Sequence, residues 1–215
     1  MLWRENLVMY DRQTDSWWSQ ADGKAIRGAK RGTQLVQLPS DLMRFDEWRA
    51  LHPGTTVLST GERPGPDRYR TYHDGRAIGV TGRTRSAGAL DAKARVLGFR
   101  LGDRAFAVSM ETLVTPRVVQ ADAGGRPVVV VLGPDRQTAR VFLAREHRFA
   151  VGTPSSPRLI MQDASTLTFW DAFAGTAVTG ALAGSQLEPV PAHLSFWFSW
   201  HSFFPDATII GGRAR

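Results

Sequence analysis

The 215-residue sequence contains no cysteine. This absence excludes disulfide bonds, thiolate catalysis and any zinc or iron–sulfur site with cysteine ligands. The sequence also lacks a run of about 20 apolar residues, the length that a helix needs to cross a bilayer. Its first residues lack the apolar core of a secretion signal. We therefore expect a protein without membrane contact, cytoplasmic as the sequence stands and exported if a leader was removed.

Lysine is scarce, and the three lysines are Lys24, Lys30 and Lys93. The net charge of +7 therefore comes mainly from arginine. A positive charge is typical of nucleic-acid-binding proteins, because Lys and Arg contact phosphates. Here the cations alternate with acidic residues, and only residues 61–95 hold a local concentration of arginine. We do not expect a nucleic-acid partner, and non-specific nucleic-acid binding is the weakest of three functional hypotheses.

The motifs of familiar enzyme classes are also missing. The sequence contains no Gly-x-Ser-x-Gly elbow, no Gly-x-Gly-x-x-Gly loop and no Walker loop. None of its five histidines has the His-x-x-x-His spacing of a zinc site. We expect no cofactor.

The most informative feature that is present is an internal duplication. Residues 6–58 align with residues 158–210 at a constant offset of 152, without a gap, and 17 of the 53 aligned pairs are identical. A repeat identifies the residues that a shared backbone requires. We interpret the following shared residues as structural: Asp11, Trp18, Gly23, Gly28, Gly32, Pro39 and Trp48 in the first copy, and Asp163, Trp170, Gly175, Gly180, Gly184, Pro191 and Trp200 in the second.

The residue pattern predicts a mainly β fold, barrel-like or sandwich-like, with α+β as the alternative. Each copy has apolar residues at i, i+3 and i+6 followed by a proline, which predicts short helices near residues 44–52 and 195–204. A final strand is expected in each copy, at 56–58 and at 208–210.

Between the copies, a Gly-Asp turn at 102–103 predicts a hairpin. The apolar run PVVVVL at 127–132 predicts a strand that is buried on both faces and pairs with 138–143. We divide the chain into a first repeat unit (1–60), an arginine-rich connecting loop (61–95) and a β-rich segment with the second repeat unit (96–215), together forming one compact domain.

The second copy is preceded by the β-rich residues 96–150, whereas the first copy begins close to Met1. Three explanations are open: the first copy borrows strands from 96–150, it pairs with another subunit, or an upstream segment has been lost. Because an unpaired sheet edge favours further strand pairing, we predict a homodimer through an uncovered edge of the first repeat.

Several short motifs resemble those of one protein family. They are NLVMYDR at 6–12, WSQ at 18–20, GKAI at 23–26, RVLG at 95–98, GRPVV at 125–129, LEPVP at 187–191 and FWF at 196–198. Together they resemble the prokaryotic family called domain of unknown function 3179. The resemblance implies the repeat architecture and a bacterial or archaeal origin, but no activity. It also implies a longer protein with an upstream Cys-x-x-Cys segment, which this sequence lacks, so we infer no catalytic residue from it.

The leading hypothesis for function is a binding module for a small polar or anionic ligand, contacted by the loop at 61–95. This loop has no counterpart in the repeat, and loops on a rigid scaffold often carry function. The candidate ligand-binding residues are Arg68, Arg70, Tyr72, His73, Asp74 and Arg76. The alternative interpretation of the same residues is a solvated turn.

The second hypothesis is an enzyme, a hydrolase or a metal-dependent one, that uses Asp11 and Asp163 with His73 or His201. Asp11 and Asp163 are the only acidic residues kept in both copies, so they could bind a metal or act as a base. Each also follows a strand directly, where an aspartate commonly caps the next turn. The shared tryptophans could stack on a ligand, but their duplication favours core packing.

Overall fold

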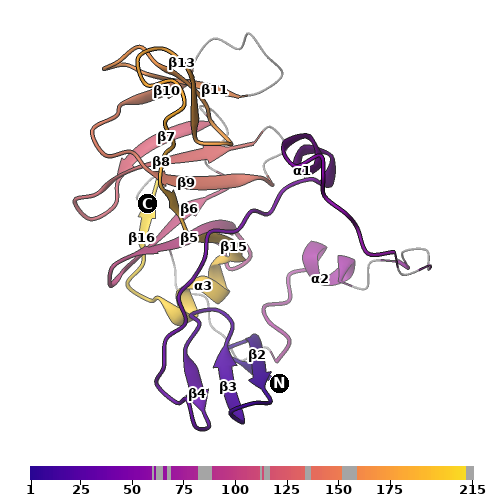
Figure 1. Cartoon of the computed structure of the whole chain (residues 1–215). Coiled ribbons are helices and arrows are strands. Elements are labelled where there is room, and N and C mark those ends of the chain that lie inside the picture. Colours follow the sequence, from indigo (N-terminus) through magenta and orange to yellow (C-terminus); the bar gives the residue numbers. More distant parts are fainter. Residues whose placement is uncertain are drawn as a thin grey trace.

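The computed structural model describes residues 1–59, 61, 65–66, 69–81, 89–111, 113, 117–133, 137–151 and 159–211. The described chain is mainly β, with 39% strand and 10% helix. This confirms the predicted fold class. The strands form four small sheets, which Figure 1 shows together with the short helices.

Two sheets make the centre of the fold, in the orders β14-β9-β8-β7 and β15-β5-β6-β16. Their strands are β5 (Arg95–Leu101), β6 (Arg104–Ser109), β7 (Val118–Asp122), β8 (Pro127–Leu132), β9 (Ala139–Leu143), β14 (Pro189–Val190), β15 (Ala192–Phe196) and β16 (Thr208–Ile210). Only Pro191 separates β14, which pairs with β9, from β15, which pairs with β5. The chain thus passes from one sheet into the other, and the two sheets form a half-barrel.

Strand β8 explains why this centre holds together. Val128, Val130 and Leu132 point into the core between the two central sheets, whereas Val129 and Val131 belong to a second core on the other face. All five side chains are at most 1% exposed. The predicted strand that is buried on both faces is therefore confirmed.

The second repeat covers both outer sides of this centre. Its first part, β11 (Ile160–Asp163), β12 (Phe169–Asp171) and β13 (Thr176–Thr179), forms a sheet with the preceding strand β10 (Phe149–Val151). Met161 and Trp170 of this sheet pack against β8 and β9. Its helix α3 (Trp197–Phe203) packs Trp197 and Trp200 against the outer face of β5 and β6.

The first repeat forms β1 (Leu2–Trp3), β2 (Asn6–Asp11), β3 (Ser16–Ser19), β4 (Ala25–Arg27) and helix α1 (Phe45–Leu51). A register shift lies at Trp17/Trp18 in this copy and at Phe169/Trp170 in the second, again 152 residues apart. Helices α1 and α3 match the predicted positions. Figure 1 shows the first sheet at the opposite end of the molecule from β10–β13, with the chain then running along the central sheets to α1.

The predicted final strand is right for one copy and wrong for the other. Residues 208–210 form β16 and pair in parallel with β6, but residues 56–58 are not a strand. The reason is that this edge of β6 already holds β16. Among the described residues, β1–β4 pair only with one another, so the first copy does not borrow strands from the central sheets.

The connecting loop contains one short helix, α2 (Arg70–Asp74). None of the helices in the described ranges has the length and apolar character needed to span a membrane.

Candidate functional site

Residues 35–44, which we call the strap, connect the first sheet to α1 and lie against the second repeat. Gln37 Nε2 lies 3.3 Å from His193 Nδ1 on β15. Further along the strap, the Asp41 carboxylate accepts two hydrogen bonds from Arg140 on β9, at 2.6 and 2.5 Å. These contacts join residues that are 156 and 99 positions apart in the chain, so the strap attaches the first repeat to the second repeat at His193 and to the central sheet at Arg140.

A cavity of about 340 Å³ lies where the first sheet, the strap and α3 meet. We call it the inter-repeat cavity. Its wall combines amide, hydroxyl and imidazole groups with three aromatic rings: Asn6, Gln20, Ala21 and Gln37 from the first repeat, and His193, Leu194, Ser195, Ser199, Trp200, Phe203 and Phe204 from the second. Among the described residues that line it, none carries a formal charge when His193 is neutral.

His193 is held in its neutral form. Burial lowers the pKa of the imidazole below its usual value of 6.5, because a charged ring would lose hydration. The ring lies 5.2 Å from the Trp200 ring, edge to face. A neutral imidazole has one donor and one acceptor nitrogen. Because the Gln37 amide nitrogen is a donor, Nδ1 is the acceptor, and the Nε2–H of His193 is the donor left for a ligand.

Trp200 contributes a buried indole whose Nε1–H has no hydrogen-bond partner among the described residues. The side chain is 3% exposed and cannot turn freely, because its ring lies against Gly98. A Cβ at Gly98 would stand 2.4 Å from the ring. Burying an unpaired N–H costs about 1–3 kcal/mol. This nitrogen has almost no accessible surface, so a ligand in the cavity does not reach it.

The edge of the cavity is fixed by a contact between the repeats. Ser199 Oγ donates to Asn6 Oδ1 at 2.8 Å, and Asn6 Nδ2 donates to the Arg4 carbonyl at 2.9 Å. Ser199 is 8% exposed, so its hydroxyl has little access to solvent. The start of β2 is thereby attached to α3.

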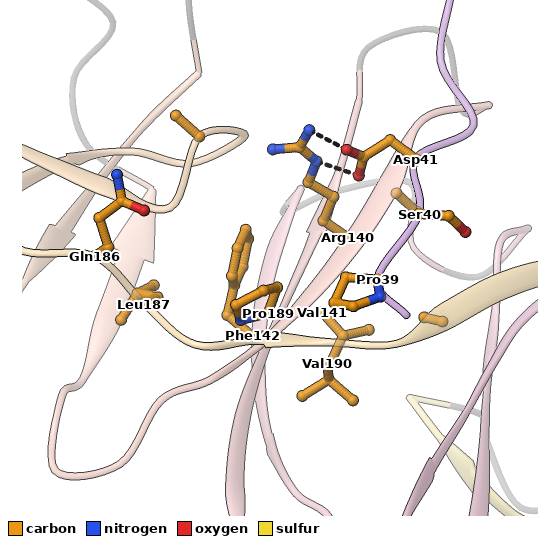
Figure 2. Close-up of a pocket in the computed structure, with 13 residues that line it drawn as sticks. Pro39, Ser40, Asp41, Arg140, Val141, Phe142, Gln186, Leu187, Pro189 and Val190 are labelled. Carbon is orange, nitrogen blue, oxygen red and sulfur yellow. Dashed lines mark hydrogen bonds and ion pairs between the residues drawn. The ribbon is translucent and has the colours of Figure 1, made fainter. Parts of the chain in front are cut away.

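A second, smaller cavity of about 180 Å³ lies beneath the strap, and Figure 2 shows its lining. Its floor is apolar, with Val141, Phe142 and Val190 among the residues that form it. The only charged residues in its lining are Arg140 and Asp41, which face each other across the pair of dashed bonds in Figure 2. Because the guanidinium is bound in bidentate fashion, Arg140 acts here as an anchor for the strap.

The structure does not bring the predicted loop residues to either cavity. Arg70 and Asp74 form an exposed ion pair at 3.8 Å, and His73 and Arg76 are exposed. Tyr72 packs beneath Lys93, whose ammonium lies 4.2 Å from the centre of the ring. Arg68 lies outside the described residues. The loop candidates therefore remain a prediction.

Asp163 acts as a turn cap and is completely buried. Its carboxylate accepts hydrogen bonds from the Arg148 and Ser165 amides and from the Ser165 and Thr166 hydroxyls, and the His147 ring nitrogen lies 3.0 Å away. Burial acts to raise the pKa of Asp163, but the hydrogen bonds outweigh it and hold the pKa well below the usual value.

Asp11 caps the equivalent turn of the first copy. It accepts hydrogen bonds from the amides of Gln13 and Thr14 and from the Thr14 hydroxyl, which lower its pKa. The proposed metal candidate His201 packs its ring 5.1 Å from that of Trp197. Within the described ranges, no three His, Asp or Glu side chains are grouped as metal ligands.

Sequence reasoning did not select His193, Gln37 or Gln20. One signal was available: the alignment places His193 opposite Asp41, so the two copies differ in polarity and charge at a position between conserved Pro39/Pro191 and Leu42/Leu194. Nothing in the sequence shows that Gln37 and His193 meet.

The fold defines a mainly β protein built from two similar units, with a polar cavity between them. The chain belongs to the family described as "Protein of unknown function (DUF3179)", whose model matches residues 1–207. No curated protein and no solved structure matches the chain.

Proposed function

We propose that the protein is a binding module that takes a small, uncharged, hydrogen-bonding ligand in the inter-repeat cavity. The observation that carries the proposal is the cavity of about 340 Å³ in which the Gln37 amide meets His193 beside the rings of Phe203 and Phe204. Ligand sites are typically about 300–1,000 Å³, mostly apolar, with a few convergent polar groups.

The lining favours a neutral ligand over an anion. A carboxylate or phosphate moved into this cavity would lose hydration without meeting a cation, which is unfavourable. A ligand with hydroxyl or amide groups would instead pair with Gln20, Gln37 and His193. The rings of Phe203 and Phe204 offer an apolar wall, so the ligand class is one with an apolar face and a polar rim, such as a sugar ring or a nucleoside.

The test is a ligand-observed NMR screen of the full chain at about 1 mM ligand, the weak end of specific binding. The neutral probes are a set of monosaccharides and nucleosides, and the anionic probes are acetate and inorganic phosphate. We expect a neutral probe to bind and both anions to fail. Failure of every neutral probe, or preference for the anions, contradicts the proposal.

The informative variant is Gln37→Ala, which removes an amide from the cavity wall. We expect it to weaken binding about 5- to 30-fold, corresponding to a hydrogen bond of about 1–2 kcal/mol. His73→Ala is the matched control at the predicted loop site. Loss of binding in this variant alone would show that the ligand binds at the loop and not in the inter-repeat cavity.

A further inference from the structure

The first repeat exposes apolar residues whose counterparts in the second repeat are buried or, for Leu194, partly buried. We call Leu35, Leu38, Leu42, Phe45 and Leu58 the first-repeat face. They are 46%, 74%, 62%, 53% and 90% exposed. Their counterparts at the offset of 152 include Leu187, Val190, Trp197 and Ile210, which are 7%, 5%, 1% and 6% exposed.

The backbone at both ends of the helix is the same in the two copies. The residue before α1 has φ −63° and ψ 144°, and the residue before α3 has φ −76° and ψ 145°. The residues that follow the helices have φ −130° and ψ 72°, and φ −128° and ψ 72°. The difference in burial therefore comes from what lies against each copy, because the local conformations agree.

In the second repeat, the covering partner is the β unit at residues 95–151. β14 pairs with β9, β15 pairs with β5 over five residues, and β16 pairs with β6. Trp197 packs in a core with Val96 and Ala107 of the same unit. In the first repeat, residues 37–44 and 56–58 correspond to β14, β15 and β16, but they are described by the structure and form no strand.

We propose that the first-repeat face binds an additional β unit with the same fold as residues 95–151. In this additional unit, the strand edges equivalent to those of β5, β6 and β9 are vacant. Residues 40–44 would then add to a β5-like edge, 56–58 to a β6-like edge, and 37–38 to a β9-like edge. A second copy of this chain does not fit that role, because its own β15, β16 and β14 occupy these three edges.

The shared tryptophan supports this occupant. In the second repeat, Trp200 fits a hollow that Gly98 leaves on β5. Trp48 stands at the same position of α1, where it is only half-buried and donates to Thr55 Oγ1 at 2.9 Å. The first-repeat face has a tryptophan at the equivalent position, Trp48. We therefore expect its partner to contain a β5-like strand with a glycine opposite Trp48, as Gly98 lies opposite Trp200.

The test is a fusion in which a second copy of residues 95–157 stands directly before Asn6, in place of residues 1–5. This reproduces the chain spacing between β10 and β11, because position 158 corresponds to position 6. Amide hydrogen exchange at residues 40–51 and 56–58 is compared with that of the unfused chain. We expect exchange to slow by at least about tenfold, as docking raises the local opening free energy.

The matched control is the same fusion with Phe45→Asp and Leu58→Asp, which places charges on the first-repeat face and leaves the added unit unchanged. We expect this variant to lose the protection. Equal exchange in the two fusions overturns the proposal. So does sedimentation of the unfused chain as a dimer with residues 45–51 protected, because the occupant is then a second copy.

Discussion

Helices α1 and α3 stand 152 residues apart in the chain and have matching backbones at both ends, yet α3 buries four residues and α1 buries none. The comparison separates two contributions to the fold. The repeat pattern specifies the strands, turns and helix of each copy, and the β unit at 95–151 decides which copy has a core. The inter-repeat cavity lies between a firmly packed unit and a loosely packed one.

The largest difference should appear when the first apolar residue of each helix is truncated. Trp197→Ala removes a ring that is 1% exposed, and we expect it to lower the free energy of unfolding by about 3–5 kcal/mol. Phe45→Ala removes a ring that is 53% exposed and should cost about 0.5 kcal/mol or less. Urea unfolding of both variants measures the contrast, and similar losses would show that α1 is packed as α3 is.

The two turn-capping aspartates give a smaller contrast. Asp163→Ala removes a completely buried carboxylate that accepts from the Arg148 and Ser165 amides, so we expect a loss of about 1–3 kcal/mol. Asp11→Ala should cost less, because the Asp11 carboxylate is only partly buried and water can replace it at the exposed Gln13 amide. Thermal unfolding of the two variants at neutral pH tests this order, and an equal or larger loss for Asp11→Ala would reverse it.

The smallest expected effect is the pH dependence that His193 introduces on the second-repeat side of the cavity. Its folded pKa is lowered, so the unfolded state binds a proton more readily as the pH falls below 6.5. The free energy of unfolding therefore falls as the pH drops from 6.5 to the lower folded pKa of His193. Above pH 6.5 this loss is absent.

His193→Gln removes this titration and keeps a polar side chain. The melting temperature of the variant should change less between pH 7 and pH 5 than that of the wild-type chain. Identical pH profiles would mean that His193 is not held neutral by burial.

The sequence was sufficient to predict helices and strands that depend on local patterns. The i, i+3, i+6 spacing at 45–51 and 197–203, followed by Pro53 and Pro205, predicted α1 and α3, and the run of four valines predicted β8 as a doubly buried strand. These signals are local, since helix spacing, proline breaks and apolar runs act within a few residues.

The candidate site was not predictable in the same way, because it is assembled by contacts that span the chain. Gln37 contacts His193, Asp41 contacts Arg140 and Asn6 contacts Ser199 only when the strap and β2 lie against the second repeat and β9. The prediction of a final strand in the first copy was wrong for a related reason. Residues 56–58 have strand-forming composition, but a strand needs an available edge, and the edge of β6 is taken by β16.

Native-state hydrogen exchange of the unmodified chain tests the central claim most directly, namely that the β unit at 95–151 gives a core to the second copy alone. The account predicts that amides of Trp200–Phe203 in α3 and of β16 exchange at least about tenfold more slowly than those of Trp48–Leu51 in α1 and of residues 56–58. Equal protection of the two helices would contradict it.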